Sequence, residues 1–163
     1  MTAHDRFAAH ELIHRWWVNY DEGNLGVLGD LLADDCHLSS RTDRGQHPQE
    51  DFIRSDNRGR EEVMAWTAEH RARSPYPLRH HATNVHVTAE RDGEIDLESY
   101  LFVNQIVERR PAPLSSGIVR WTLLSTPGGY RVLRQDVVLD SIESAPFHEV
   151  ADVASSTSGP VRI

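Results

Sequence analysis

Two residues of this sequence, Asp21 and His80, have the side chains needed for proton transfer near neutral pH. A histidine with an ordinary pKa gains and loses a proton close to pH 7 without extensive tuning by its surroundings. A carboxylate beside the imidazole holds it in one tautomer and stabilises its charged form. The structural alternative is that Asp21 only ends a helix beside Gly23, and that His80 only forms hydrogen bonds within a sheet.

A second pattern, HELIH at residues 10–14, matches the H-E-x-x-H signature of zinc proteases. That site needs a third ligand and a large catalytic domain, whereas this segment opens a chain of 163 residues that holds ten histidines. The adjacent His80 and His81 would point to opposite faces of a strand. We therefore predict no metal site at either place.

Several kinds of covalent and cofactor chemistry are excluded by composition. All 17 basic residues are arginine, so a lysine Schiff base and pyridoxal phosphate attachment are ruled out. Cys36 is the only cysteine, which rules out an internal disulfide and a cysteine-ligated zinc or iron–sulfur cluster. The sequence also lacks a glycine-rich phosphate-binding loop. We predict that Cys36 is simply packed and that no cofactor is required.

Charge and hydropathy limit the possible partners. The formal net charge is −8 and the arginines are dispersed, which argues against nucleic-acid binding. No apolar run approaches the roughly 20 residues that a membrane helix needs. The first residues do not resemble a secretion signal, so a cytoplasmic location is expected.

The first half of the chain has helical periodicity. Apolar residues recur at helical spacing between residues 5 and 20, and the polar segment 21–24 breaks the pattern. A short second helix is predicted over 25–32, followed by a strand at 36–40. Residues 41–57 are polar and charged, which predicts a long loop, and a third helix follows over 59–73.

The second half changes to the alternation typical of strands. Long antiparallel strands are predicted over 79–89, 94–108, 116–126 and 129–142, with turns at 92–93 and 127–129. One face of the strand 94–108 is predicted to be core, and it carries Ile95, Leu97, Leu101, Val103 and Val107. Beyond residue 143 the composition favours a loosely ordered tail over 144–163.

These elements predict an α+β domain over residues 1–143, in which about three N-terminal helices pack on a curved, mostly antiparallel sheet. A sheet wrapped around a helix forms a cone whose open mouth suits a small molecule. Tyr100, Phe102 and Ile106 fall on the face away from the core, which is more apolar than solvent favours. We therefore expect a homodimer assembled through the sheet.

The order of the elements and four short segments resemble a known family. The segments are YDEGN at 20–24, LLADDC at 31–36, RHHATNV at 79–85 and GYRV at 129–132. Over residues 5–142 the chain resembles the SnoaL-like branch of the nuclear transport factor 2-like superfamily, which implies a cystatin-like cone. The superfamily includes polyketide cyclases, scytalone dehydratase, ketosteroid isomerases, limonene epoxide hydrolase and beta subunits of ring-hydroxylating dioxygenases, so the fold alone does not settle function.

The resemblance also implies site residues. Tyr20 and Asp21 match a Tyr-Asp pair that closes the first helix of scytalone dehydratase-like members, and His80 matches their histidine at the start of a long strand. Their second histidine is missing, since a leucine follows Tyr100, and Ile118 falls near their asparagine. A reduced site remains, in which His80 is the general acid/base, Asp21 orients it, and Tyr20 or Tyr100 donates a hydrogen bond to a substrate oxygen.

Further candidates extend this site. Cyclase-like members use an acid on a late strand, which makes Asp136 a secondary catalytic candidate, with Arg134 beside it. The side chains predicted to contact a ring-shaped apolar substrate are Trp17, Trp66, Tyr76, Asn84 and Tyr100.

Two functions from different classes follow from this sequence. The first is a cofactor-independent lyase, isomerase or cyclase that moves a proton on a small apolar polycyclic or aromatic substrate. The second is a non-catalytic subunit or ligand-binding module that resembles a ring-hydroxylating dioxygenase beta subunit, because such subunits carry strings similar to those at 79–85 and 131–140.

Overall fold

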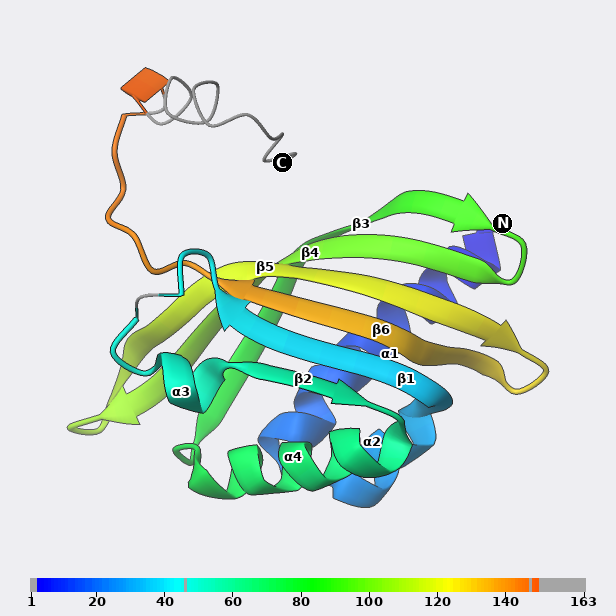
Figure 1. Cartoon of the computed structure of the whole chain (residues 1–163), viewed down its shortest axis with the longest axis horizontal. Coiled ribbons are helices and arrows are strands. Elements are labelled where there is room, and N and C mark those ends of the chain that lie inside the picture. Colours follow the sequence, from blue (N-terminus) through cyan, green and yellow to red (C-terminus); the bar gives the residue numbers. More distant parts are fainter. Residues whose placement is uncertain (1–2, 46, 147, 150–163) are drawn as a thin grey trace.

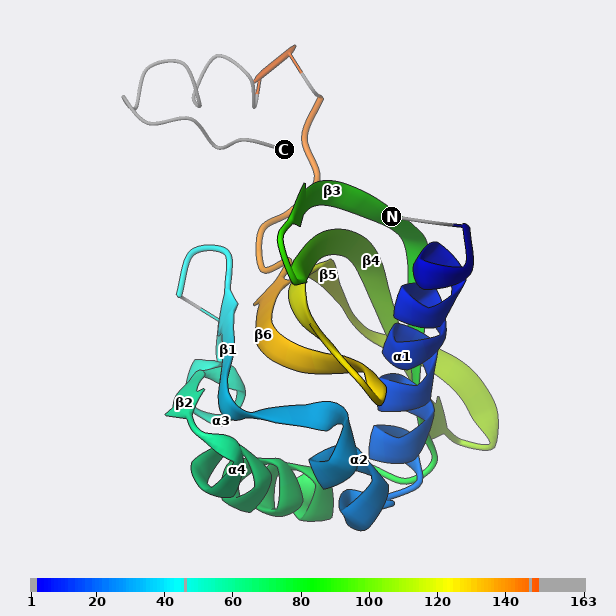
Figure 2. The same cartoon turned by 90° about the vertical axis from the view of Figure 1, so that its right-hand side faces the viewer.

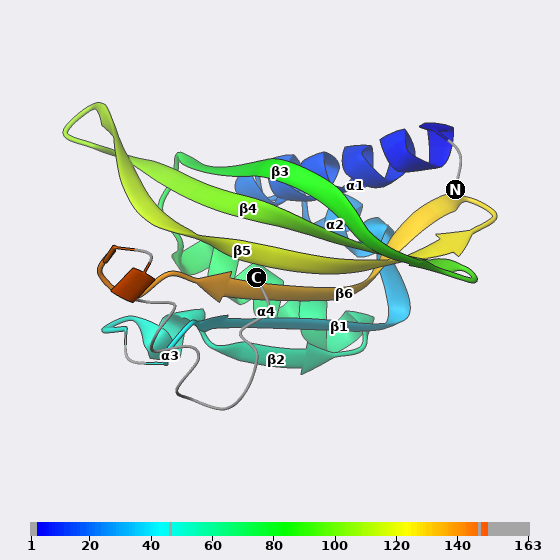
Figure 3. The same ribbon diagram turned by 90° about the horizontal axis from the view of Figure 1, so that it is seen from above.

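One mixed sheet forms the body of the protein, for which a computed structural model describes residues 3–45, 47–146 and 148–149. Its strand order is β2-β1-β6-β5-β4-β3, and the strands lie side by side in Figure 3. The strands are β1 (Leu32–Thr42), β2 (Ser55–Arg58), β3 (Leu78–Arg91), β4 (Glu94–Val107), β5 (Arg110–Thr126) and β6 (Gly129–Leu139). Only the β1–β6 pair is parallel among these six strands.

In the described part of the chain, four helices accompany the sheet: α1 (Ala3–Asp21), α2 (Leu25–Leu31), α3 (Glu50–Ile53) and α4 (Arg60–Arg73). The long strands curve around α1, while α2 and α4 close one end of the cone (Figures 1 and 2). The predicted α+β class, with N-terminal helices packed on a curved, mostly antiparallel sheet, is therefore confirmed.

The core lies between α1 and the concave face of the sheet. Ile13 and Trp16, one turn apart on α1, are fully buried, and the Trp16 ring meets the edge of Trp121 on β5 with centroids 6.3 Å apart. Ile95 and Leu97 of β4 are buried as the alternation predicted. Val107, which was expected on the same face, is exposed because it lies at the far end of the strand.

The segment 41–57, predicted as one long loop, contains regular structure. β1 continues to Thr42, α3 forms a single turn, and β2 pairs antiparallel with β1 through Ser40 opposite Ser55. The β2 sequence SDNR has no apolar alternation, and α3 is too short to show a period. Both elements depend on contacts with the rest of the fold, which local sequence patterns do not report.

The turn before β5 also differs from the prediction, because β5 begins at Arg110 and not near residue 116. Glu108 and Arg109 form a two-residue turn with positive φ values of 49° and 63°, between the paired Val107 and Arg110. That geometry is typical of a type I′ turn, which usually carries Asn-Gly or Asp-Gly. Glu-Arg at these positions hides the turn from sequence inspection.

An extra residue in β6 sets which of its side chains face the core. Leu123 of β5 pairs with Val132, while the preceding Thr122 pairs with Arg134, so Leu133 has no partner and forms a β-bulge. Beyond the bulge the alternation changes phase, so that Gln135 is buried and Arg134 is exposed. An unbroken alternation from Val132 would have placed Arg134 inside.

The outer face of the sheet carries the apolar patch from which a homodimer was predicted. Tyr100, Phe102 and Ile106 are 50%, 44% and 44% exposed in the single chain. We expect a solution mass of twice 18.5 kDa by light scattering at micromolar concentration, and Phe102→Arg should shift the protein toward monomer. A mass of 18.5 kDa for the wild type at that concentration would contradict the expectation.

Most of the predicted tail, residues 144–163, lies outside the described residues. Within the described ranges, none of the helices has the length and apolar character required to cross a membrane.

Candidate functional site

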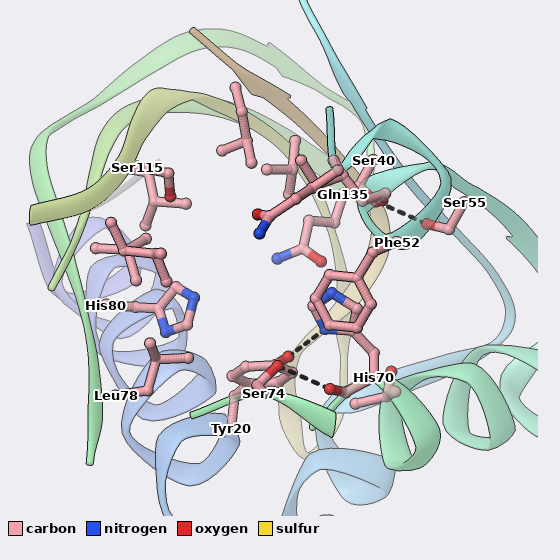
Figure 4. A pocket seen from close by; sticks show the side chains of 18 of the residues that line it. Tyr20, Ser40, Phe52, Ser55, His70, Ser74, Leu78, His80, Ser115 and Gln135 are labelled. Atoms are coloured by element: carbon pink, nitrogen blue, oxygen red, sulfur yellow. Dashed lines mark hydrogen bonds between the residues drawn. The ribbon is translucent and has the colours of Figure 1, made fainter. Parts of the chain in front are cut away.

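A cavity of about 190 Å³ opens between the helices and the concave face of the sheet. Its walls come from α1, α3, α4 and the six strands, and they are mostly apolar. Polar side chains from different walls point into the same space (Figure 4). These include Tyr20, Ser40, His70, His80, Ser115 and Gln135.

The structure brings Asp21 and His80 together at this cavity. Asp21 is the last residue of α1 and is buried, while His80 lies near the start of β3. The Asp21 Oδ1 atom lies 2.5 Å from His80 Nδ1, and Asp21 Oδ2 accepts the backbone N–H of His80 at 2.9 Å. With the carboxylate as acceptor, Nδ1 carries the proton and Nε2 has no partner among the described residues.

Two aromatic rings of α1 hold the His80 imidazole in place. Trp17 stacks on it with centroids 4.5 Å apart and an interplanar angle of 7°, and Tyr20 meets it edge-on at 5.2 Å. The ring can therefore rotate little, and its orientation is set before any ligand binds. Trp17, Tyr20 and His80 all line the cavity.

A second polar pair, which sequence analysis did not identify, forms another part of the wall. Tyr20 Oη and His70 Nδ1 are joined by a hydrogen bond of 2.5 Å, whose direction depends on the His70 tautomer. Burial raises the pKa of Tyr20 to about 12. Burial, followed by the charges of His80, Arg73 and Arg71, lowers the pKa of His70 to about 4. Both groups are thus neutral at pH 7.

Aromatic stacking holds His70 in this position. Its ring stacks with Trp66 of the same helix at 4.6 Å and with Phe52 of α3 at 4.3 Å. The sequence could have indicated His70 as a site residue, because it lies four residues after Trp66 and therefore on the same face of the predicted helix. Nothing in the local pattern pointed to Phe52, because it lies in the segment predicted to be a loop.

The short helix α3 is fastened beside the cavity by a buried carboxylate. Glu50 accepts a hydrogen bond of 2.5 Å from the hydroxyl of Thr42 and forms an ion pair of 2.9 Å with Arg54. The pKa of Glu50 is lowered, mainly by the hydrogen bond from the Thr42 hydroxyl and to a smaller extent by the charge of Arg54. This arrangement keeps Phe52 against His70.

Three predicted site residues lie on the other side of the sheet. Asn84, Tyr100 and Asp136 line a separate hollow on the convex face, and Arg134 lies there too. Asp136 accepts a hydrogen bond of 2.9 Å from Ser39. The prediction that these residues contact a substrate in the cavity therefore does not hold. The bulge in β6 turns Asp136 outward, and Tyr100 lies on the outer face of β4, where the strand alternation also placed it.

Tyr76 also lies outside the cavity and is 67% exposed. Its hydroxyl donates to Glu22 at 3.3 Å, and its ring lies 5.8 Å and 5.9 Å from the guanidinium carbons of Arg71 and Arg79. Tyr76 therefore helps to attach the α4–β3 connection to the end of α1.

Metal-binding side chains do not converge on the HELIH segment. His14 is exposed, and the described residues contain no group of three or more His, Cys, Asp or Glu side chains arranged to hold a metal ion. Cys36 is packed in the core, as predicted, and burial raises the pKa of its thiol.

Solved structures with the same architecture include proteins of several kinds. An NTF2-like protein with a cystatin-like fold from Novosphingobium aromaticivorans has a TM-score of 0.68 and 22% identity, covering 90% of this chain and 88% of that chain. A proposed scytalone dehydratase from the same organism has a TM-score of 0.65 and 17% identity, covering 86% and 89%. The beta subunit of a proposed aromatic-ring-hydroxylating dioxygenase, also from that organism, has a TM-score of 0.66 and 13% identity, covering 86% and 92%.

These similarities establish the fold alone, because sequence identities this low do not show a shared function. A search of the curated proteins finds no match to the sequence. The family model of the SnoaL-like domain, however, matches residues 1–136, which are most of the chain. This protein therefore belongs to the SnoaL-like domain family.

Proposed function

We propose that this protein is a cofactor-independent lyase, isomerase or cyclase that moves a proton on a small apolar or aromatic substrate bound in the cavity. The observation that carries the proposal is the 2.5 Å contact between Asp21 and His80, whose imidazole lines the cavity. The contact engages Nδ1 of the imidazole and leaves Nε2 available to a ligand. A histidine held in this way can act as a general acid or base toward a ligand within hydrogen-bond reach of Nε2.

The chemistry follows from the two nitrogens of His80. Neutral His80 accepts a proton at Nε2 from a carbon beside a substrate carbonyl, and the electron pair of the broken C–H bond forms an enolate. The Asp21 carboxylate stabilises the imidazolium that results. Return of that proton to another carbon gives isomerisation, and its delivery to a β-hydroxyl releases water. The stacked ring of Trp17 keeps Nε2 aimed at the substrate during both transfers.

A bicyclic ketone tests the proposal without knowledge of the natural substrate. The protein should accelerate exchange of the α-protons of 2-tetralone in D₂O, which is measured as loss of their ¹H NMR signals. Enolisation is the step common to the reactions above, so exchange reports it even when no product forms. An exchange rate equal to that of buffer alone would contradict a catalytic role toward ketones.

The alternative, a non-catalytic subunit or ligand-binding module, is favoured by the similarity to the dioxygenase beta subunit. The same experiment separates the two, because such a module would bind 2-tetralone without accelerating its exchange. Binding is then detected by shifts of the His80 ring signals in the protein spectrum.

A further inference from the structure

The cavity contains buried hydrogen-bond donors that have no acceptor. Gln135 and Trp17 are each only 6% exposed, and both line the cavity. Gln135 Nε2 and Trp17 Nε1 lack a hydrogen-bond partner within the described part of the chain. Because a buried N–H without a partner is unfavourable, most such groups in proteins are paired, and the exceptions need an explanation.

Gln135 is held in this position by the sheet. It pairs with Trp121 on β5 and with Leu38 on β1, so apolar residues flank it on both sides. The bulge at Leu133 directs its side chain to the concave face. Figure 4 shows Gln135 and His80 on different walls of the cavity, with their polar ends directed into the space between them.

The missing partner must be an acceptor, and the charge of the site suggests its kind. No arginine lines the cavity in the part of the chain that is described, and the sequence has no lysine. A carboxylate or phosphate ligand would therefore find no permanent cation to pair with. A neutral carbonyl oxygen fits the Gln135 amide better.

The size of the cavity limits the rest of the ligand. Its volume of about 190 Å³ is only moderately larger than the roughly 150 Å³ cavity that encloses a benzene molecule. The walls around the polar groups are apolar, with Leu38, Leu101 and Val137 among them. A ligand of one or two rings fits this space better than a larger fused system.

We propose that the ligand is a neutral one- or two-ring ketone whose oxygen accepts the Gln135 Nε2–H. This inference rests on the proposed function for the role of His80 and identifies its substrate class. As a proton leaves the adjacent carbon for His80, negative charge develops on the ketone oxygen. A fixed amide donor aimed at that oxygen stabilises the charge as it forms. Gln135 thus both selects the ketone and assists its enolisation.

The test compares two probes that differ in one oxygen, 2-tetralone and the hydrocarbon tetralin, by titration calorimetry. The wild type should bind 2-tetralone about tenfold more tightly than tetralin, as expected for one buried hydrogen bond. Gln135→Met has similar length and no N–H donor, so it should bind the two probes equally and keep the affinity for tetralin. Gln135→Leu serves the same purpose if the methionine variant does not fold.

Two results would overturn the inference: equal binding of the two probes by the wild type, or an undiminished preference for 2-tetralone in the variants. The same measurements distinguish a failure of this inference from a failure of the proposed function. If the wild type prefers 2-tetralone through Gln135 but does not accelerate its exchange, the ketone site stands and catalysis is refuted. If exchange is fast and the Gln135 variants retain it together with the preference, catalysis stands and the ketone contact is refuted.

Discussion

His80→Ala should lower the rate of 2-tetralone exchange by about 10²- to 10⁴-fold, which is the usual contribution of a positioned general base. Asp21→Asn should lower it by a similar factor, because it removes the charge that stabilises the imidazolium while leaving the shape of the side chain nearly unchanged. The rates are measured by ¹H NMR in D₂O at pH 7. Circular dichroism verifies that each variant is folded.

The neighbouring histidine provides a matched control. His81 is exposed on the other face of β3, where its Nε2 lies 2.7 Å from Asn104 Oδ1. His81→Ala should leave the exchange rate unchanged. Added imidazole should restore part of the rate to His80→Ala, which it could not do if His80 had only a structural role. Full activity in either His80→Ala or Asp21→Asn would refute the dyad.

Acidification should destabilise the protein through His70. Because its pKa is about 4 in the folded chain and about 6.5 in the unfolded chain, the unfolded state binds more protons between these values. The stability that neutral His70 contributes is fully present above pH 6.5 and is lost as the pH falls toward 4. Because His70 is partly exposed, solvent reduces the effect of this pKa shift. We therefore expect protonation of His70 to lower the free energy of unfolding by about 2 kcal/mol.

Urea unfolding at pH 7 and at pH 4.5, at one protein concentration, measures this loss. His70→Gln serves as the comparison, because it keeps a polar side chain that does not titrate. The wild type should lose more free energy of unfolding than His70→Gln over this pH interval. Equal losses in the two proteins would show that His70 is not the group responsible.

Much of the architecture could be predicted because its signals are local. The spacing of Ile13 and Trp16 marked the buried face of α1, and the alternation in β4 separated Leu97 inside from Tyr100 outside. The Asp21–His80 contact came from the resemblance of short segments to a family, since 59 residues separate the two positions in sequence. No periodicity argument reaches across that distance.

What could not be predicted depended on tertiary contacts. His70 acquires its low pKa from burial against Phe52 and Trp66, and Phe52 is placed there by a helix of a single turn. Asp136 was proposed because cyclase-like members use an acid on a late strand, but the bulge at Leu133 turns Asp136 outward and Gln135 into the cavity. A bulge has no reliable sequence signature when the extra residue is an ordinary leucine.

The β-bulge at Leu133 determines which position of β6 could place an acid in the cavity. An acid on the inner face of β6 would have to stand at position 135, because the acid that this chain carries at position 136 faces outward. The codons for glutamine and glutamate differ at one base, so a single nucleotide substitution would replace a neutral donor with a titratable carboxyl group in the cavity. A chain with glutamate at this position is therefore one mutational step away from this one.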